Sequence, residues 1–365
     1  SFGLNTGVTI FNGFQNVYLN DQAKIGIETS KLQLDILKDN ISLNVVNEYL
    51  NVLFNKENLR IAKDQINITQ LQIDQIQELV IAGVKAKADL FETQAQLASN
   101  LESVVNAQNS VDLALLSLAQ LLQISHVGFD IESVILDVDS FQLRYNNADT
   151  IYDKASIERP EIKNAELDIE NSELNIKLAK SVFLPSLNFG AGVGTSYQHY
   201  QGQEDVRLQF VDPSNPSAGT ELVPNGFGQQ LEDNLGYNFG FSLSVPIFNG
   251  LKTKANVNRA IINKKKTAFV LEQKKQDLRT NIERSFADAR AALNQFEASK
   301  ASVKAQEEAY RNAQQSYDLG VMTSFDFEQV RNRFVNAQSA LINAKYNFVF
   351  KTKVLDFYNG IPLTN

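Results

Sequence analysis

Two aspartates follow similar turns in this chain of 365 residues. Asp89 closes the run "AGVKAKAD", which contains Gly83, and Asp326 closes "LGVMTSFD", which contains Gly320. A group of carboxylates attracts cations and can bind multivalent ones. An Asp at the start of a helix can instead accept hydrogen bonds from the unpaired N–H groups of the first turn. The residues alone leave both interpretations open.

The composition excludes most other chemistry. There is no Cys and there are only two His residues, so we predict no metal site and no cofactor. The formal net charge of −8, without a concentrated basic patch, argues against a nucleic-acid partner. Neither a Ser-His-Asp arrangement nor a pair of carboxylates stands out, and we therefore predict that the protein is not an enzyme.

The two turns belong to an internal repeat. "VTIFNG" ends at Gly13 and "VPIFNG" ends at Gly250, so the offset is 237 residues (13 to 250). The same offset carries one turn onto the other, including the two aspartates. One ungapped register that extends so far indicates a duplicated unit.

Each copy begins with a long predicted helix. Before the first turn, apolar residues recur every seven positions, which is the spacing of a coiled-coil seam: Leu59, Ile66, Ile73 and Val80. A second stripe beside this seam suits a helix that packs on both sides, as in a ring: Ile61, Ile68 and Leu71. At 1.5 Å per residue, each long helix would extend roughly 100 Å. A shorter helix is predicted after each turn, over about 85–122 and 323–357.

Three stretches alternate with a period of two instead. They cover about 1–11, 183–200 and 235–248, and they set apolar or aromatic residues opposite Gly, Ser or Asn. This pattern is typical of strands between lipid and a polar lumen, although half-buried soluble strands share it. No run approaches the ~18 consecutive apolar residues of a membrane-spanning helix. The polar segment 201–234 is predicted to be a long loop.

Taken in order, these motifs resemble the TolC-like outer-membrane efflux protein family. The resemblance rests on "IFNG" after a strand, "ERPEI" at 158–162, "LPSL" before a strand, and two Gly-Val turns followed by Asp. It extends over residues 1–363 and implies an α+β membrane protein that forms a homotrimer. Each protomer would give four strands to one twelve-stranded outer-membrane β-barrel, continuous with a long α-helical coiled-coil barrel in the periplasm.

The same resemblance divides the chain. The implied parts are a first repeat 1–124, an equatorial segment 125–148, a second repeat 149–361 with an extracellular loop 201–234, and a C-terminal tail 362–365. The second repeat opens near Asp149 with a predicted short helix, a break at Pro160 and a longer helix. The counterpart of Asp149 would fall before Ser1. We therefore expect roughly 88 further residues upstream, which would hold a helix and the first strand.

The resemblance also assigns roles to the turn residues. The tips match positions that contact a periplasmic membrane-fusion adaptor and, through it, an inner-membrane pump: Ala82, Gly83, Val84, Leu319, Gly320 and Val321. Both glycines could equally serve as helix ends with positive φ.

Other residues near the turns match the closed end of the family's tunnel. Asp326, Asp89 and Tyr317 match residues that line it or gate it. Met322 stands in place of a basic gate residue, and Gln329 in place of an acidic one. The constriction would therefore depend on Met322 and Phe325.

We predict an outer-membrane exit duct, surrounded by outer-membrane lipid, that passively conducts small toxic compounds expelled by the pump. The alternative with the same fold is the exit channel of a type I protein secretion system. A soluble coiled-coil scaffold would share the heptads, but it has no use for amphipathic strands or a long loop.

Overall fold

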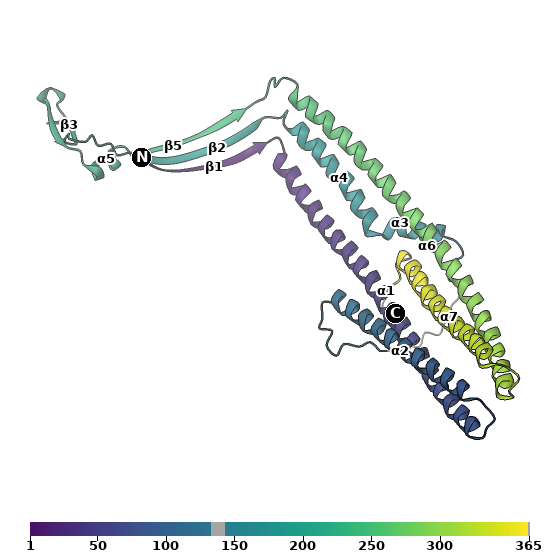
Figure 1. The fold of residues 1–365 in the computed structure, drawn as a ribbon. Helices are drawn as coiled ribbons and strands as arrows, with labels where there is room; N and C mark the ends of the chain where they lie inside the picture. The colour runs from purple at the N-terminus through teal and green to yellow at the C-terminus, as the bar shows by residue number, and fades with distance from the viewer. Residues whose placement is uncertain (133–142, 364–365) are drawn as a thin grey trace. The chain divides into compact units, whose positions relative to one another are not determined.

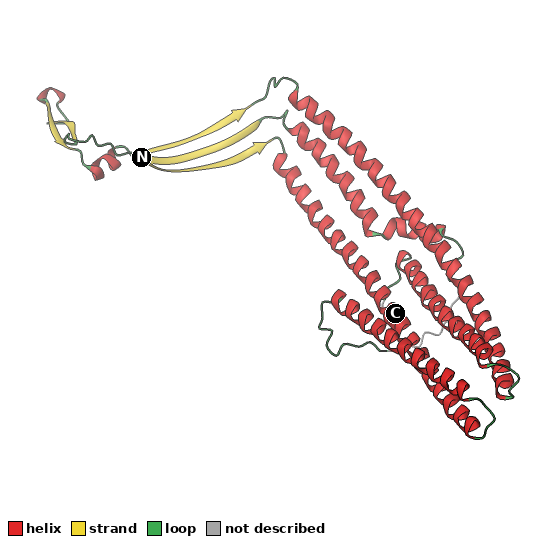
Figure 2. Cartoon of the chain, in the orientation of Figure 1, coloured by secondary structure: helices red, strands yellow, loops and turns green. Residues whose placement is uncertain are grey.

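A computed structural model describes residues 1–132 and 143–363 of the chain (Figure 1). The helices are α1 (Gln15–Ile81), α2 (Lys87–Leu121), α3 (Asp149–Glu158), α4 (Pro160–Ser181), α5 (Phe227–Asp233), α6 (Lys252–Asp318) and α7 (Ser324–Tyr358). The strands are β1 (Phe2–Asn12), β2 (Ser186–Thr195), β3 (Val206–Phe210), β4 (Thr220–Pro224) and β5 (Gly236–Ser244), as Figure 2 shows. The chain forms two compact units, residues 1–28 with 167–269 and residues 29–166 with 270–365.

The helices repeat the duplication found in the sequence. α1 and α6 are both 67 residues long, and α2 and α7 are both 35 residues long. Both later helices begin 237 positions after their counterparts, at 252 against 15 and at 324 against 87. The backbone repeats as well, because φ is 74° at Gly83 and 73° at Gly320. The predicted internal duplication is confirmed.

The first unit contains an antiparallel sheet in the order β1-β2-β5. Directly opposed residues of adjacent strands lie on one face, so Val8, Phe189 and Phe241 form a single row. None of the described residues covers this apolar face, and Phe239 is 81% exposed. The three predicted strands are confirmed, and β2 starts later than expected because Pro185 marks the boundary with the preceding helix.

The segment between β2 and β5 is not the featureless loop that its composition predicted. It contains an antiparallel hairpin of β3 and β4, and the short helix α5. Val206, Leu208 and Phe210 alternate along β3, and Leu208 pairs with Leu222 of β4. The Pro- and Gly-rich stretch falls in the connection 211–219, where it interrupts neither strand. Turn residues in the middle of the segment therefore concealed two short strands beside them.

The second unit is built from the paired helices. The predicted α1 seam faces other helices, since Leu59 and Ile73 are buried. The adjacent stripe is divided, because Ile61 is buried while Leu71 is 70% exposed. The short helix, the break and the longer helix predicted around Pro160 are present as α3 and α4. None of the described helices is apolar over a stretch long enough to cross a membrane.

Candidate functional site

The two turns end their helices in the same way. Gly83 N–H donates to Val80 O at 3.0 Å and Val84 N–H donates to Leu79 O at 2.9 Å. The second turn repeats this pattern, with Gly320 N–H to Tyr317 O at 3.0 Å and Val321 N–H to Ser316 O at 2.9 Å. These are the paired hydrogen bonds of a Schellman motif, in which the glycine supplies the positive φ. The interpretation of both glycines as helix ends is therefore confirmed.

The residues beside the glycines are available for contact. Val84 is 70% exposed and Val321 is 81% exposed. Ala82 and Leu319 are exposed as well. Each turn thus presents apolar side chains that nothing in the described part of the chain covers.

Asp326 lies in the first turn of α7, where Thr323 is the capping residue. The Thr323 hydroxyl accepts a hydrogen bond from Asp326 N–H at 3.2 Å and donates one to Asp326 Oδ2 at 2.7 Å. This reciprocal pairing resembles a capping box. The interpretation of Asp326 as the capping residue is wrong, because the backbone N–H of Asp326 is itself capped by the Thr323 side chain. The Asp326 side chain remains exposed.

Asp89 occupies the equivalent place in α2 without the same partner. The capping residue there is Ala86, which has no side-chain acceptor. Asp89 N–H donates to Ala86 O at 3.1 Å, and the Asp89 carboxylate lies in the first turn of the helix. A negative charge at this end of a helix is favourable because the N-terminus carries a partial positive charge. Asp89 is therefore also not the capping residue.

The other candidate gate residues separate into buried and exposed ones. Tyr317 is only 6% exposed and stacks on Phe327, with 4.8 Å between the ring centroids. Met322 packs against the same cluster, which joins α1, α6 and α7, whereas Phe325 is exposed. Lys85 Nζ lies 3.7 Å above the Tyr317 ring, a cation–π contact between the two turns. No motif in the sequence points to Lys85.

A polar cluster lies farther along the same helices. Arg331 of α7 is 2% exposed and pairs with Glu328 at 2.6 Å. Its Nη1 donates to Thr69 Oγ1 and to Gln72 Oε1, both of α1 and both at 3.1 Å. Asn100 Nδ2 of α2 donates to the same Thr69 hydroxyl at 2.8 Å. One guanidinium thus connects α7 with the α1–α2 hairpin.

Burial affects both charged members of this cluster. It raises the pKa of the Glu328 carboxyl, which the positive charge of Arg331 opposes. It also lowers the pKa of the Arg331 guanidinium, which the charge of Glu328 opposes. Each charge therefore depends on the other to remain ionised away from water.

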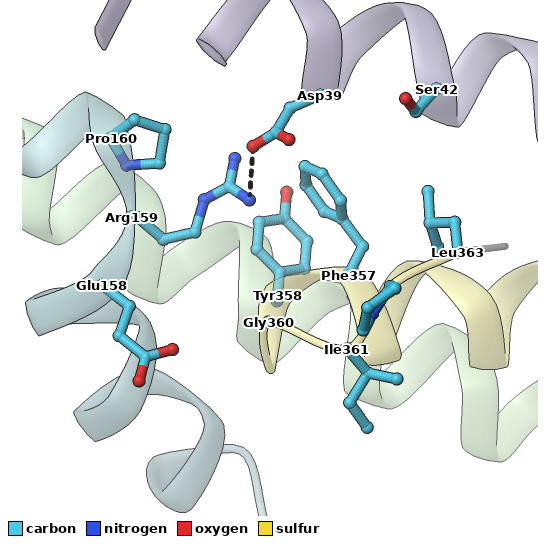
Figure 3. A pocket seen from close by; sticks show the side chains of 11 residues that line it. Asp39, Ser42, Glu158, Arg159, Pro160, Phe357, Tyr358, Gly360, Ile361 and Leu363 are labelled. Atoms are coloured by element: carbon cyan, nitrogen blue, oxygen red, sulfur yellow. Dashed lines mark ion pairs between the residues drawn. The ribbon is translucent and has the colours of Figure 1, made fainter. Parts of the chain in front are cut away.

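The surface is concave where α3 meets α4. This concavity is a pocket of about 440 Å³, drawn in Figure 3. Arg159 is buried there, pairs with Asp39 at 3.1 Å and with Glu161 at 2.7 Å, and covers the Phe357 ring at 4.1 Å. Pro160 holds the preceding residue extended, and Arg159 has φ −65° and ψ 131°. These contacts fasten the break between the two helices to α1 and α7.

Most of the chain matches one family of known proteins. Residues 1–122 and 151–355 match the family described as outer membrane efflux protein. The chain belongs to the outer membrane efflux protein family. Together, the two matched ranges include both turns and every candidate residue around them.

Individual relatives are similar over nearly the full chain. Outer membrane protein TolC of Escherichia coli K12 is 25% identical over 325 residues, which are 89% of this chain and 62% of that protein. The alkaline protease secretion protein AprF of Pseudomonas aeruginosa is 22% identical over 87% of this chain and 62% of its own length. A crystal structure of CusC, at 17% identity, has a TM-score of 0.77 over 99% of this chain and 77% of that one.

Membership of the outer membrane efflux protein family fixes the class of protein. The α+β fold is that of outer-membrane efflux channels, and the family consists of channel proteins rather than enzymes. The protein is located in the outer membrane and extends into the periplasm. The soluble coiled-coil scaffold that the heptads left open is therefore wrong. The chain spans 62% of the length of the TolC relative.

Proposed function

We propose that the protein is the outer-membrane exit duct of a tripartite export system. In this proposal it passively conducts small toxic compounds that an inner-membrane pump expels through a periplasmic adaptor. The observation that supports the duct most strongly is the β1-β2-β5 sheet, whose aromatic face is exposed and whose opposite face is polar. That arrangement suits strands with lipid on one side and water on the other.

The sheet also supports assembly from several copies. β1 and β5 each have a free edge within the described residues. Unpaired backbone groups are not tolerated in lipid, so the edges must pair with other strands to close a barrel. We propose a homotrimer in which each protomer contributes four strands to a twelve-stranded barrel.

The exposed turns are the proposed adaptor contacts. Val84 and Val321 present apolar side chains at the tips of two similar hairpins, which gives an adaptor two related docking points per protomer. Asp326 is the proposed ion-binding residue of the tunnel end, and Asp89 its weaker counterpart. Tyr317, Met322 and Phe325 are the proposed constriction.

The remaining divisions of the chain are proposals as well. Residues 1–124 and 149–361 would be the two repeats, with 201–234 at the extracellular side. The equatorial segment 125–148 would lie between them, although 133–142 of it are outside the described residues. The tail 362–365 extends beyond them from residue 364.

A second candidate is the exit channel of a type I protein secretion system. The relative AprF is an alkaline protease secretion protein, and its similarity covers 87% of this chain. The two functions differ in their cargo. Deletion of the gene should sensitise cells to small toxic compounds in an efflux system, whereas an unexported polypeptide should accumulate in a secretion system.

The duct itself is tested by single-channel current of the complete, purified protein in a planar lipid bilayer. Discrete and long-lived conductance steps are expected. Release of the native, complete protein from membranes by salt or osmotic shock would refute the proposal.

A further inference from the structure

The three strands β1, β2 and β5 and their flanking residues carry no fixed charge. Residues 1–20, 181–203 and 234–251 contain no Asp, Glu, Lys or Arg, although these residue types make up 21% of the chain. Lipid explains the absence of charge on one face of the strands only. The other face of a membrane strand normally lines a polar interior, where charges are common. Its neutrality therefore requires a separate reason.

The strand register shows which residues share the polar face. Its four successive rows are Gly3-Gly194-Gly236, Asn5-Gly192-Asn238, Gly7-Gly190-Gly240 and Thr9-Asn188-Ser242. Two rows consist of glycine alone, and the other two consist of amides, hydroxyls and one glycine. Rows with hydrogen-bonding side chains thus alternate with rows of bare backbone along the strands.

The side chains of this face engage one another. Thr9 Oγ1 donates to Asn188 Oδ1 at 2.9 Å. A Cβ built on Gly192 would meet Asn5 Oδ1 and would lie 2.6 Å from Asn238 Oδ1. The two carboxamides therefore converge over Gly192, and a side chain at this position would displace them. A Cβ on Gly240 would meet no atom within 4 Å, so the glycine rows are open.

We infer that the polar face formed by β1, β2 and β5 does not select solutes by charge. The inference rests on the proposed function. Carboxamides and hydroxyls both donate and accept hydrogen bonds, so they serve cationic, anionic and neutral solutes alike. A fixed charge in a narrow bore would favour one sign. Charge selection is left to the acidic residues of the turns, and the class of compounds that the strands admit is broad.

The absence of cysteine makes a direct test possible. Ser242→Cys places one thiol on the polar face of the full chain. Its labelling rate is measured with a methanethiosulfonate that carries a sulfonate and with one that carries a trimethylammonium group. Each rate is divided by that reagent's rate with a free thiol in solution. The two normalised rates are expected to agree within about two-fold, because no fixed charge lies nearby.

Two variants serve as matched controls. Phe241→Cys lies next to Ser242 on the opposite, apolar face, and neither charged reagent should reach it. Gly240→Asp, added to Ser242→Cys, puts a carboxylate into open space on the polar face. It should favour the cationic reagent by about five-fold, which shows that the measurement detects a charge in the bore.

The outcomes separate this inference from the proposed function. A strong preference for one sign in Ser242→Cys would overturn the inference and leave the duct in place. An unchanged ratio in Gly240→Asp would overturn the explanation by neutrality, because charge on this face would then not govern access. Equally rapid labelling of Phe241→Cys and Ser242→Cys would instead show that the apolar face is not in lipid, and the duct itself would fail.

Discussion

Arg331 occupies a position that helix periodicity reserves for apolar side chains. It lies four residues after Phe327 and three before Phe334, both of which contribute to aromatic packing. A lone Arg on such a face is a signal, but its meaning could not be predicted from the sequence. Its hydrogen-bond acceptors Thr69 and Gln72 are supplied by α1, about 260 residues away. Only the tertiary structure shows that the charge is buried and paired.

Removal of the guanidinium should be costly because it leaves Glu328 buried and unpaired. We expect Arg331→Met to lower the free energy of unfolding by about 3–5 kcal/mol. Arg331→Met combined with Glu328→Gln should regain most of the loss. The repeat-related residue Gln94 is exposed, and Gln94→Met should change stability by less than about 0.5 kcal/mol. Denaturant unfolding followed by circular dichroism measures all three, and equal losses in the single and double variants would contradict the buried pair.

The same pair predicts a pH dependence. The folded-state pKa of Glu328 is raised above its ordinary value of 4.5 by burial. Between the ordinary pKa of Glu328 and its raised folded-state pKa, the folded state binds more protons than the unfolded state. The free energy of unfolding therefore falls as pH rises through this window. In Arg331→Met the opposing charge is absent, so the pKa of Glu328 should rise further and the loss of stability should be larger and extend to higher pH. Melting temperatures across acidic pH should show this, and Glu328→Gln should remove the dependence.

The Thr323 and Asp326 pair allows capping and ion binding to be separated. Thr323→Ala removes the cap at a cost of about 1 kcal/mol, but it keeps the Asp326 carboxylate. Asp326→Ser removes the carboxylate. Block of single-channel current by multivalent cations should therefore weaken in Asp326→Ser and persist in Thr323→Ala. If Asp326→Ser leaves block unchanged, the residue serves the helix start alone.

At the scale of elements, the predictable features were those that repeat along the chain. Heptads predicted the long helices, alternation predicted β1, β2 and β5, and Pro160 predicted the break between α3 and α4. The β3-β4 hairpin was missed because each strand has only five residues. A strand this short gives too few alternations to outweigh the Pro and Gly residues between the two.

The glycines that end α1 and α6 give a prediction at the scale of elements. Gly83 and Gly320 have positive φ, which costs a residue with a Cβ about 1–2 kcal/mol. Gly83→Ala and Gly320→Ala should each destabilise the protein by this amount. Gly26 lies within α1, and a Cβ added to it would meet no atom within 4 Å outside its own helical turn. Gly26→Ala should therefore stabilise the protein by up to ~1 kcal/mol. Equal effects at Gly26 and Gly83, measured by thermal unfolding, would contradict the role of the turns.

At the scale of the whole molecule, exposed apolar residues indicate what one chain leaves uncovered. Leu71 lies on the second stripe of α1 and is 70% exposed, whereas Ile73, two residues later, is buried within the chain. If copies of the chain form a ring, Leu71 faces a neighbouring copy and Ile73 does not. Leu71 therefore tests the contact between copies, and Ile73 tests the packing within one chain.

Leu71→Asn should lower the temperature at which detergent-solubilised trimers dissociate, because the substitution removes apolar area between copies and leaves the interior of each chain unchanged. The helix content of Leu71→Asn should match that of the unaltered protein. Ile73→Ala creates a cavity within the chain and should lower helix stability by about 2–5 kcal/mol. Semi-native gel electrophoresis over a temperature series measures dissociation, and circular dichroism measures helix content. A trimer that tolerates Leu71→Asn as well as it tolerates an exposed polar substitution would place this stripe in water and move the contact between copies to another face of the helices.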